Sequence, residues 1–472
     1  MPKQDNEPTN EDLAGTEPPA PLLKIGVSRA VWTVAWPMAL IGLCRSCYYL
    51  CDSYWIGKLG TTHLAALGGS AFAWWMMFIT CNIPGYGVNA LVARHEGAAR
   101  RDQIAPAIVQ GLWVGLVVYL GLVGLAYPLR ELYFSLLGFA PGSEERLLGS
   151  EYIGIGLIGS LALAAHAVTL AAFRGIGDTR TALWITAISL LLNAGLDPVM
   201  IWGWFGCPAM GIAGAAWATT AANATAALLG TLILARKGYI LIPRWPVFKS
   251  FRLIGRIGLP IAAEGVGFSL VYVLLGQFIT DFGSEQMAAL GVGHRLESLA
   301  YMVCVGFQVG ASTMVGQYLG AGDPKGAARA ANQAVLLCAG IVLPTSIALY
   351  LFAPQLFALF TDDPVTAAAG VHYLRIQALV AVFMGIEVVF QGGFTGSGDT
   401  MPPLLIGVSL TAARIPLAWL LAWPLGMGIS GVWWAIALST LLKGLVFWLW
   451  FRRGRWVNAL SAADLQIDAE RS

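Results

Sequence analysis

The sequence predicts an all-α integral membrane protein with twelve transmembrane helices in two pseudo-symmetric six-helix lobes. Three observations lead to this prediction. Hydrophobic residues make up 57% of the 472 residues and charged residues only 11%, whereas a soluble domain carries about 25% charged residues. Apolar runs of about 20 residues, long enough to cross a bilayer, recur along the chain. A set of short motifs also appears twice, once in each half.

The apolar runs define the predicted spans. They cover residues 28–56, 62–91, 104–126, 148–173, 180–203, 209–235, 254–280, 287–319, 327–351, 366–394, 401–424 and 428–451. Several are longer than the roughly 20 residues that a bilayer needs. Such helices must tilt, bend or extend beyond the lipid.

Basic residues are distributed unequally between the two sides of the predicted membrane. An even number of spans places both termini on one side, and the loops on that side contain basic pairs at 100–101 and 236–237. The opposite side has only Lys58, Arg130 and Arg146. Because basic loops stay in the cytoplasm, we expect a multi-pass protein of the cell inner or plasma membrane with both termini cytoplasmic.

The motifs of the first half recur in the second half at a nearly constant spacing. The aligned pairs are PMA at 37–39 with PIA at 260–262, FRGIGDT at 173–179 with FTGSGDT at 394–400, and MGIAG at 210–214 with MGISG at 427–431. Six spans separate the partners, so both halves share one topology. The symmetry axis should therefore run along the membrane normal, as in transporters built from parallel repeats.

The repeat also predicts the domain organisation. We expect a disordered cytoplasmic tail at 1–21, an N-lobe at 22–236, an inter-lobe cytoplasmic loop at 237–253, a C-lobe at 254–453 and a second cytoplasmic tail at 454–472. The first tail is polar, acidic and proline-containing, a composition that does not bury enough apolar surface to fold.

The two GxGDT sequences, at 175–179 and 396–400, lie in predicted cytoplasmic turns. Glycine permits the left-handed backbone that a tight turn between helices requires. Asp178 and Asp399 are expected to cap the helices that follow. These turns either form a gate or hinge or simply reverse the chain, and the sequence leaves both interpretations open.

Several motifs resemble those of the multidrug and toxic compound extrusion (MATE) family. They are Pro37 followed by Asp52 and Gly57-Lys58-Leu59-Gly60, Ala90-Leu91-Val92-Ala93 before a basic loop, the paired GDT turns, Leu192-Asn193 with Leu196-Asp197-Pro198, and Val315-Gly316-Gln317 with Gly320-Ala321-Gly322. The resemblance covers about residues 22–453. It implies two lobes that form a V around a central cavity and export organic compounds against inward sodium ions or protons.

Two aspartates, Asp52 and Asp197, lie inside predicted spans of the first half. An ionisable group at bilayer depth is costly and is therefore a candidate functional residue. Asn193 precedes Asp197 by one helical turn and shares its face. The two aspartates align with Leu275 and Ala418 of the second half, so they do not belong to the repeated scaffold. The set suits a sodium ion or a proton relay; the alternative is a pair of structural acids.

The family resemblance implies that Tyr48 joins Asp52, Asn193 and Asp197 in this cation- or proton-coupling site. Arg45 lies on the same helical face as Tyr48 and Asp52, where its charge would favour the ionised carboxylate. An arginine here would also favour anionic groups; alternatively, it extends to the membrane interface or only pairs with Asp52.

The second half has its own ionisable and amide residues within predicted spans, and these are candidates for its part of the cavity. They are Glu264, His294, Arg295, Glu297, Glu387, Gln391 and Arg414. The resemblance implies coupling carboxylates on the equivalents of the seventh and tenth spans, although Glu264 is shifted by about one turn. The alternative is buried ion pairs: Arg295 with Glu297 or Glu264, and Arg414 with a nearby acid.

No catalytic or nucleotide-binding motif accompanies these residues. Gly57-Lys58 lacks the rest of a phosphate-binding loop. We therefore expect a non-enzymatic secondary antiporter that exports organic, cationic or amphipathic compounds in exchange for protons or sodium ions by alternating access. A lipid-linked saccharide flippase of the same wider superfamily is the alternative within transporters. A channel and an intramembrane enzyme are alternatives from other classes.

The expected partners follow from this interpretation. We expect a monomer that contacts membrane lipids and small-molecule substrates, and no nucleic-acid partner. The only expected accessory is the coupling ion, H⁺ or Na⁺; we expect no metal site and no cofactor.

Overall fold

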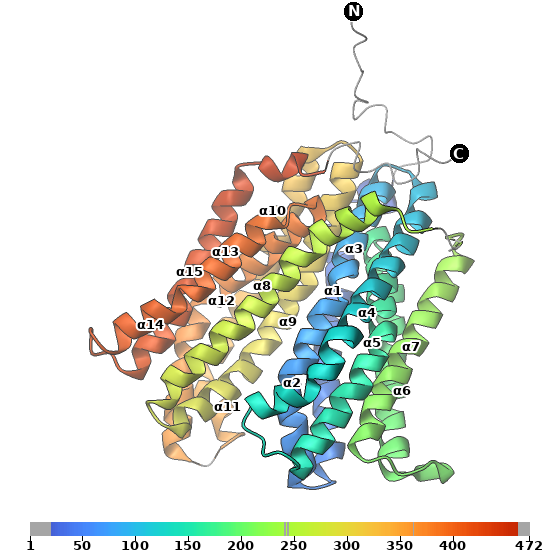
Figure 1. Ribbon diagram of the computed structural model, residues 1–472. Helices are drawn as coiled ribbons and strands as arrows, with labels where there is room; N and C mark the ends of the chain where they lie inside the picture. The colour runs from blue at the N-terminus through green and yellow to red at the C-terminus, as the bar shows by residue number, and fades with distance from the viewer. Residues whose placement is uncertain (1–19, 240–241, 243–244, 362, 461–472) are drawn as a thin grey trace, which may run out of the picture. The chain divides into compact units, whose positions relative to one another are not determined.

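The computed structural model describes residues 20–239, 242, 245–361 and 363–460, and these residues contain helices and no strand (Figure 1). The side chains of residues 46–51 and 284 also lie outside the description. Tyr48 is among them, so its predicted role falls outside the described side chains.

Fifteen α-helices account for almost all of the described chain. They are α1 (Val27–Gly57), α2 (Thr61–Cys81), α3 (Ile83–Gly97), α4 (Ile104–Leu136), α5 (Glu144–Ile176), α6 (Thr179–Trp202), α7 (Ile212–Arg236), α8 (Phe248–Thr280), α9 (Ser284–Gly320), α10 (Pro324–Leu351), α11 (Ala353–Ala358), α12 (Pro364–Ser397), α13 (Met401–Ala412), α14 (Arg414–Ala422) and α15 (Ile429–Arg452). Twelve segments are long and apolar enough to span a membrane, which confirms the predicted fold class.

Two of the predicted spans consist of a pair of helices with a break between them. The break between α2 and α3 lies at Asn82, two residues before Pro84, and the break between α13 and α14 lies at Ala413, three residues before Pro416. A proline ring clashes with the carbonyl group four residues earlier and removes one helical hydrogen bond. The breaks therefore follow from the two prolines.

The described chain forms two compact units, which we call unit 1 (residues 43–262) and unit 2 (residues 20–42 and 263–460). The chain passes from unit 2 to unit 1 inside α1 and returns to unit 2 inside α8. The boundaries of the compact units thus differ from those of the predicted lobes, because the first half of each of these two helices belongs to the other unit.

The packing of α1 and α8 explains this division. Val31, Val34 and Ala35 of α1 are completely buried in the core of unit 2, together with Phe307 of α9. In unit 1, the first half of α8 lies so close to α3 that a Cβ atom on Gly87 would be 2.8 Å from the Cα of Ile254.

Each unit is built around one long, largely buried helix. In unit 1 this helix is α5, which contacts α2, α3, α4 and α7; in unit 2 it is α12, which contacts α9, α10 and α15. Gly392 and Gly396 of α12 lie directly against the backbone of α9 at Gln308 and Ser312, where a Cβ atom would collide. Small residues of this kind permit close helix packing in membranes.

Both GxGDT turns have the predicted left-handed glycine. Gly177 (φ 89°) ends α5 and Gly398 (φ 85°) ends α12. Asp178 caps α6 as expected, because its Oδ1 accepts a hydrogen bond of 3.2 Å from the Thr181 backbone N–H. A cap by Asp399 stays a prediction. Thr400 is the residue that precedes α13, and its side chain makes no capping bond.

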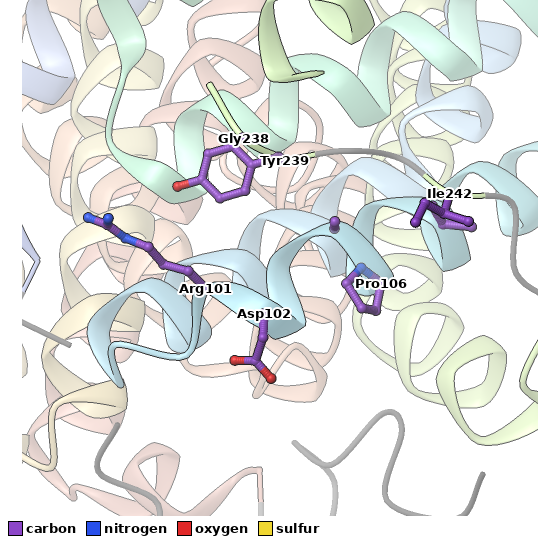
Figure 2. Close-up of a pocket in the computed structure, with 8 residues that line it drawn as sticks. Arg101, Asp102, Pro106, Gly238, Tyr239 and Ile242 are labelled. Atoms are coloured by element: carbon purple, nitrogen blue, oxygen red, sulfur yellow. The ribbon is translucent and has the colours of Figure 1, made fainter. Parts of the chain in front are cut away.

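The segment that follows α7 is attached to α4 within unit 1. The Gln110 side chain donates to the carbonyl of Trp245 (3.0 Å) and accepts from the N–H of Val247 (2.9 Å). A pocket of about 180 Å³ lies nearby, and none of the predicted coupling residues lines it. Its labelled lining residues are Arg101, Asp102, Pro106, Gly238, Tyr239 and Ile242 (Figure 2).

Candidate functional site

The candidate coupling site lies in unit 1, where α1 and α6 bring three predicted residues together. Asp52, Asn193 and Asp197 are 6%, 1% and 0% exposed. The Asn193 Nδ2 atom donates to the Asp197 Oδ1 atom over 3.1 Å, and the side chains of Asp52 and Asp197 are hydrogen-bonded to each other. Because two ionised carboxylates have no hydrogen to share, a hydrogen bond between them can form only when one of the two groups carries a proton.

Asp197 stands at the end of a buried polar stripe along α6. Thr186, Ser189, Asn193 and Asp197 follow one another at intervals of three or four residues and are all buried. That spacing places them on one face of the helix. The Ser189 hydroxyl donates to the carbonyl of Ala222 on α7 over 3.0 Å. Only Asn193 and Asp197 of this stripe were predicted from the sequence, although the helical spacing of all four residues is visible there.

Arg45 lies over an aromatic ring in unit 1. Its guanidinium carbon is 4.4 Å from the centre of the Phe78 ring, a cation–π distance. It also lies within electrostatic range of His166 and Arg174 on α5. The effect of Arg45 on the ionisation of Asp52 stays a prediction.

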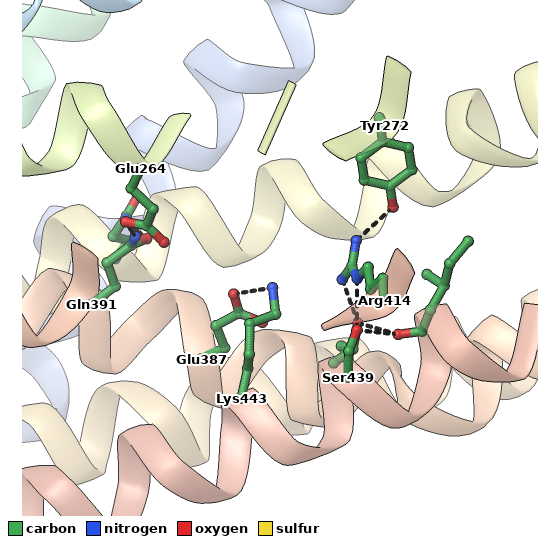
Figure 3. A network of polar contacts seen from close by, with 10 residues as sticks. Glu264, Tyr272, Glu387, Gln391, Arg414, Ser439 and Lys443 are labelled. Atoms are coloured by element: carbon green, nitrogen blue, oxygen red, sulfur yellow. Dashed lines mark hydrogen bonds and ion pairs between the residues drawn. The ribbon is translucent and has the colours of Figure 1, made fainter. Parts of the chain in front are cut away.

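In unit 2 four of the predicted residues, Glu264, Glu387, Gln391 and Arg414, belong to a polar network that extends across five helices (Figure 3). Gln391 of α12 donates to Glu264 of α8, and its own carbonyl accepts from Gln308 of α9 over 2.8 Å. One turn away on α12, Glu387 forms an ion pair of 2.6 Å with Lys443 of α15.

Arg414, at the start of α14, occupies the other end of this network and is 2% exposed. Its guanidinium group donates to the hydroxyl oxygens of Ser439 (2.6 Å), Tyr272 (2.9 Å) and Thr440 (3.2 Å). All these partners are neutral. The predicted ion pair between Arg414 and an acid is therefore not formed within the described part of the chain.

The predicted pairing of Arg295 with Glu297 or Glu264 is also wrong. Arg295 is exposed, and Glu297 instead accepts a hydrogen bond of 2.8 Å from the Tyr373 hydroxyl. His294 packs edge-on between aromatic rings, with centroid distances of 5.1 Å to Tyr272 and 6.0 Å to Tyr373. The sequence does not show which face of the long helix α9 is buried, because apolar residues occur on all of its faces.

Lys443, the partner of Glu387, was not among the residues predicted from the sequence. This lysine lies in the middle of the last predicted span, and it is only 4% exposed. An ionisable residue within a membrane span is itself a signal of function, so the same rule that selected Asp52 could have selected Lys443. Tyr272, Ser439 and Thr440 carry no comparable signal, because hydroxyl residues are common in membrane helices.

The MatE family model matches residues 37–199 and 260–420, once in each half. The chain belongs to the MATE family of efflux transporters. The double match agrees with the repeat found in the sequence. Membership also makes the chain a multi-pass membrane protein of the kind that its twelve apolar segments indicate.

Curated MATE relatives extend over nearly the whole chain. The proteins described as "Probable multidrug resistance protein NorM" are 30% identical over 459 residues in Rhodopseudomonas palustris and 28% identical over 417 residues in Thermotoga maritima. These alignments cover 91% and 86% of this chain and 92% and 88% of the relatives.

Solved MATE structures share the fold. An outward-facing multidrug resistance MATE transporter of the MOP superfamily matches with a TM-score of 0.86 and 23% identity, covering 94% of this chain and 100% of the other. A MOP superfamily transporter from Pyrococcus furiosus, described as having a binding pocket of reversed polarity, matches with a TM-score of 0.85 over 93% of this chain and 99% of its own.

Proposed function

We propose that this MATE protein is a multidrug efflux transporter that exports organic cationic or amphipathic compounds in exchange for protons. The observation that carries the proposal is the hydrogen-bonded pair of buried carboxyl groups, Asp52 and Asp197, in unit 1. The relatives named for multidrug resistance support efflux as the activity. The carboxyl pair supports the proton as the driving ion.

The chemistry of the pair favours a proton over a sodium ion. A proton between two carboxyl groups removes one of two adjacent negative charges and joins the groups through one hydrogen bond. When that proton leaves, the two carboxylates repel each other, and the unit must either rearrange or take up another cation. Asn193 orients Asp197 from the next turn of the same helix. A change in proton occupancy can in this way favour one conformation of the transporter.

Transport in proteoliposomes tests the proposal. A pH gradient and a sodium gradient are imposed separately, and accumulation of a fluorescent organic cation is followed. We expect the pH gradient alone to drive uptake, and we expect Asp52→Asn and Asp197→Asn each to reduce that uptake at least tenfold. Asp281→Asn, a change at an exposed aspartate, is the control and should transport normally.

Two results would overturn the proposal. Transport that needs sodium at constant pH would identify sodium as the driving ion. Full proton-driven transport by both asparagine variants would remove the carboxyl pair from the coupling mechanism.

A further inference from the structure

Lys443 is a buried ammonium group in the last membrane-spanning helix. It is 4% exposed, and its Nζ atom lies 2.6 Å from Oε1 of Glu387, which is 8% exposed. The two residues come from adjacent helices, α15 and α12. Both charges are therefore removed from solvent and held in direct contact, an arrangement that is stable only while each charge keeps its partner.

A second carboxyl group, Glu264, lies in the electrostatic range of the same lysine. Glu264 fits against α13 at Gly407, where a side chain would occupy its place. Its partner is the amide of Gln391, which Gln308 in turn orients. Figure 3 shows Glu264 with Gln391, and Glu387 with Lys443, as two adjacent groups. The Lys443 ammonium thus contacts one carboxyl group, Glu387, and lies within electrostatic range of a second, Glu264, and of the Arg414 charge from α14.

The ion pair has no equivalent in unit 1. The shift of 221 positions between the GxGDT turns aligns Glu387 with His166, and the shift of 217 between the MGI motifs aligns Lys443 with Ala226. Both residues of unit 1 are buried, but neither can form the pair. The two units therefore differ in opposite ways: unit 1 has the carboxyl pair, and unit 2 has a carboxylate with a lysine.

We propose that Lys443 is a tethered cation in a carboxylate site of unit 2, where its ammonium group holds the position that a small monovalent cation would otherwise take at Glu387. The positive charge at Glu387 is then permanent, because it belongs to Lys443, and unit 2 takes up no driving ion. Loss of the ammonium group opens a site for a primary ammonium ion or a sodium ion. The inference goes beyond the proposed function, because it concerns binding in unit 2 and needs no transport.

Thermal unfolding of purified protein tests this proposal. Wild type and Lys443→Ala are heated in N-methylglucamine chloride, sodium chloride or methylammonium chloride at equal ionic strength. We expect a saturable increase in the Tm of Lys443→Ala with methylammonium or sodium that is larger than any change in wild type, since a ligand that binds only the folded state stabilises it. The double variant Lys443→Ala/Glu387→Gln should lose this increase.

A second pair of variants keeps the test decisive if Lys443→Ala does not fold. Lys443→Met replaces the aliphatic volume without the charge, and we expect Lys443→Met/Glu387→Gln to unfold at a higher temperature than Lys443→Met alone. Equal stability of these two variants would overturn the proposal. So would a Tm of Lys443→Ala that is independent of the added cation, or a cation effect that persists after Glu387→Gln.

Discussion

At the scale of single residues, the buried charges of this protein are stabilised by different partners. Glu387 has a lysine, Glu297 a tyrosine hydroxyl, Glu264 an amide and Asp197 a second carboxyl group. Each arrangement supplies the hydrogen bonds without which a buried charge is expensive. A carboxyl group paired with an amide or another carboxyl group can change its proton occupancy more easily than one paired with a fixed opposite charge.

Arg414 provides the first residue-scale prediction. Its donors reach three hydroxyl groups, and those of Ser439 and Thr440 already donate to the carbonyl of Ile436. Arg414→Met removes the charge and leaves these two hydroxyls bonded. Arg414→Lys keeps a buried charge but cannot reproduce the planar fork of donors. We therefore expect Arg414→Lys to be the more destabilising substitution, by about 1–3 kcal/mol, in thermal unfolding of the purified protein.

The order of the two Arg414 variants decides this prediction. If Arg414→Met unfolds at the lower temperature, the positive charge itself stabilises unit 2, through Glu297 and the other acids of the network. Arg295→Met, at an exposed position of α9, is the matched control and should change stability little.

Single-residue reasoning from the sequence succeeded where one helix carries the whole signal. Asn193 and Asp197 are one turn apart, so their contact follows from helical geometry. It failed where the partner comes from another helix. Nothing in the spacing of Glu387 and Lys443 shows that α12 and α15 place them 2.6 Å apart.

At the scale of elements, the turn between α5 and α6 joins a helix cap to an ion pair. The Asp178 carboxylate accepts from the N–H and the hydroxyl of Thr181 and lies 2.8 Å from the Lys237 ammonium at the end of α7. Burial alone would raise the pKa of Asp178, but the hydrogen bonds from Lys237 and Thr181 outweigh it and hold this pKa below its usual value.

The second prediction concerns the pH dependence of this contact. Because the pKa of Asp178 is lower in the folded state, its stabilising effect is fully present above the unfolded-state pKa of about 3.9 and is lost as the pH falls through the folded-state pKa. Lys237→Met should lower the stability of wild type by less than about 1 kcal/mol near pH 7, since the lysine is 44% exposed. Thermal unfolding between pH 7 and pH 2 should show a constant difference down to about pH 4 and a shrinking difference below it, as Asp178 becomes protonated; a difference that stays constant down to pH 2 would contradict the prediction.

A third prediction concerns the end of α12. Gly398 has a left-handed backbone, and a Cβ atom there would lie 2.7 Å from Cγ of Leu460. Gly398→Ala should therefore destabilise the protein by about 1–2 kcal/mol, measured as a lower Tm. Gly340→Ala is the control. This glycine is inside α10, and its Cβ would meet no atom within 4 Å, so alanine should be neutral or slightly stabilising.

Element boundaries were predictable where local chemistry sets them. The glycine turns and Asp178 follow rules that act within a few residues. The second turn shows the limit of those rules, because two similar GDT sequences place different residues directly before the next helix, Asp178 before α6 and Thr400 before α13.

At the scale of the whole molecule, the repeat accounts for twelve spans, and the basic loops predict their orientation. We propose that the protein lies in the cell inner or plasma membrane with both termini in the cytoplasm. Green fluorescent protein fused after Ser472 should therefore fluoresce in a bacterial host, whereas alkaline phosphatase at the same site should be inactive. An active phosphatase fusion after Ser472 would contradict the proposed orientation. A phosphatase fusion in the loop at 138–143 should be active and is the control.

Hydropathy and the repeat were sufficient to predict the fold class, because each apolar span must satisfy its own backbone hydrogen bonds in the bilayer and therefore forms a helix. They were insufficient for the limits of the compact units. The unit in which each half of α1 and α8 packs depends on side-chain contacts, such as the shared core of Val31, Val34 and Phe307. The sequence does not reveal these contacts, because both halves of each helix are apolar.

The placement of α1 also has a consequence for how the protein folds while it is being synthesised. The first half of α1 leaves the ribosome before α9, α10 and α12, yet it shares a buried core with Phe307, Ala331 and Phe390 of those helices. The face of α1 that becomes buried therefore contacts lipid or the insertion machinery until most of the remaining chain has been synthesised. A chain that stops before α9 would therefore leave this face of α1 without the residues that bury it.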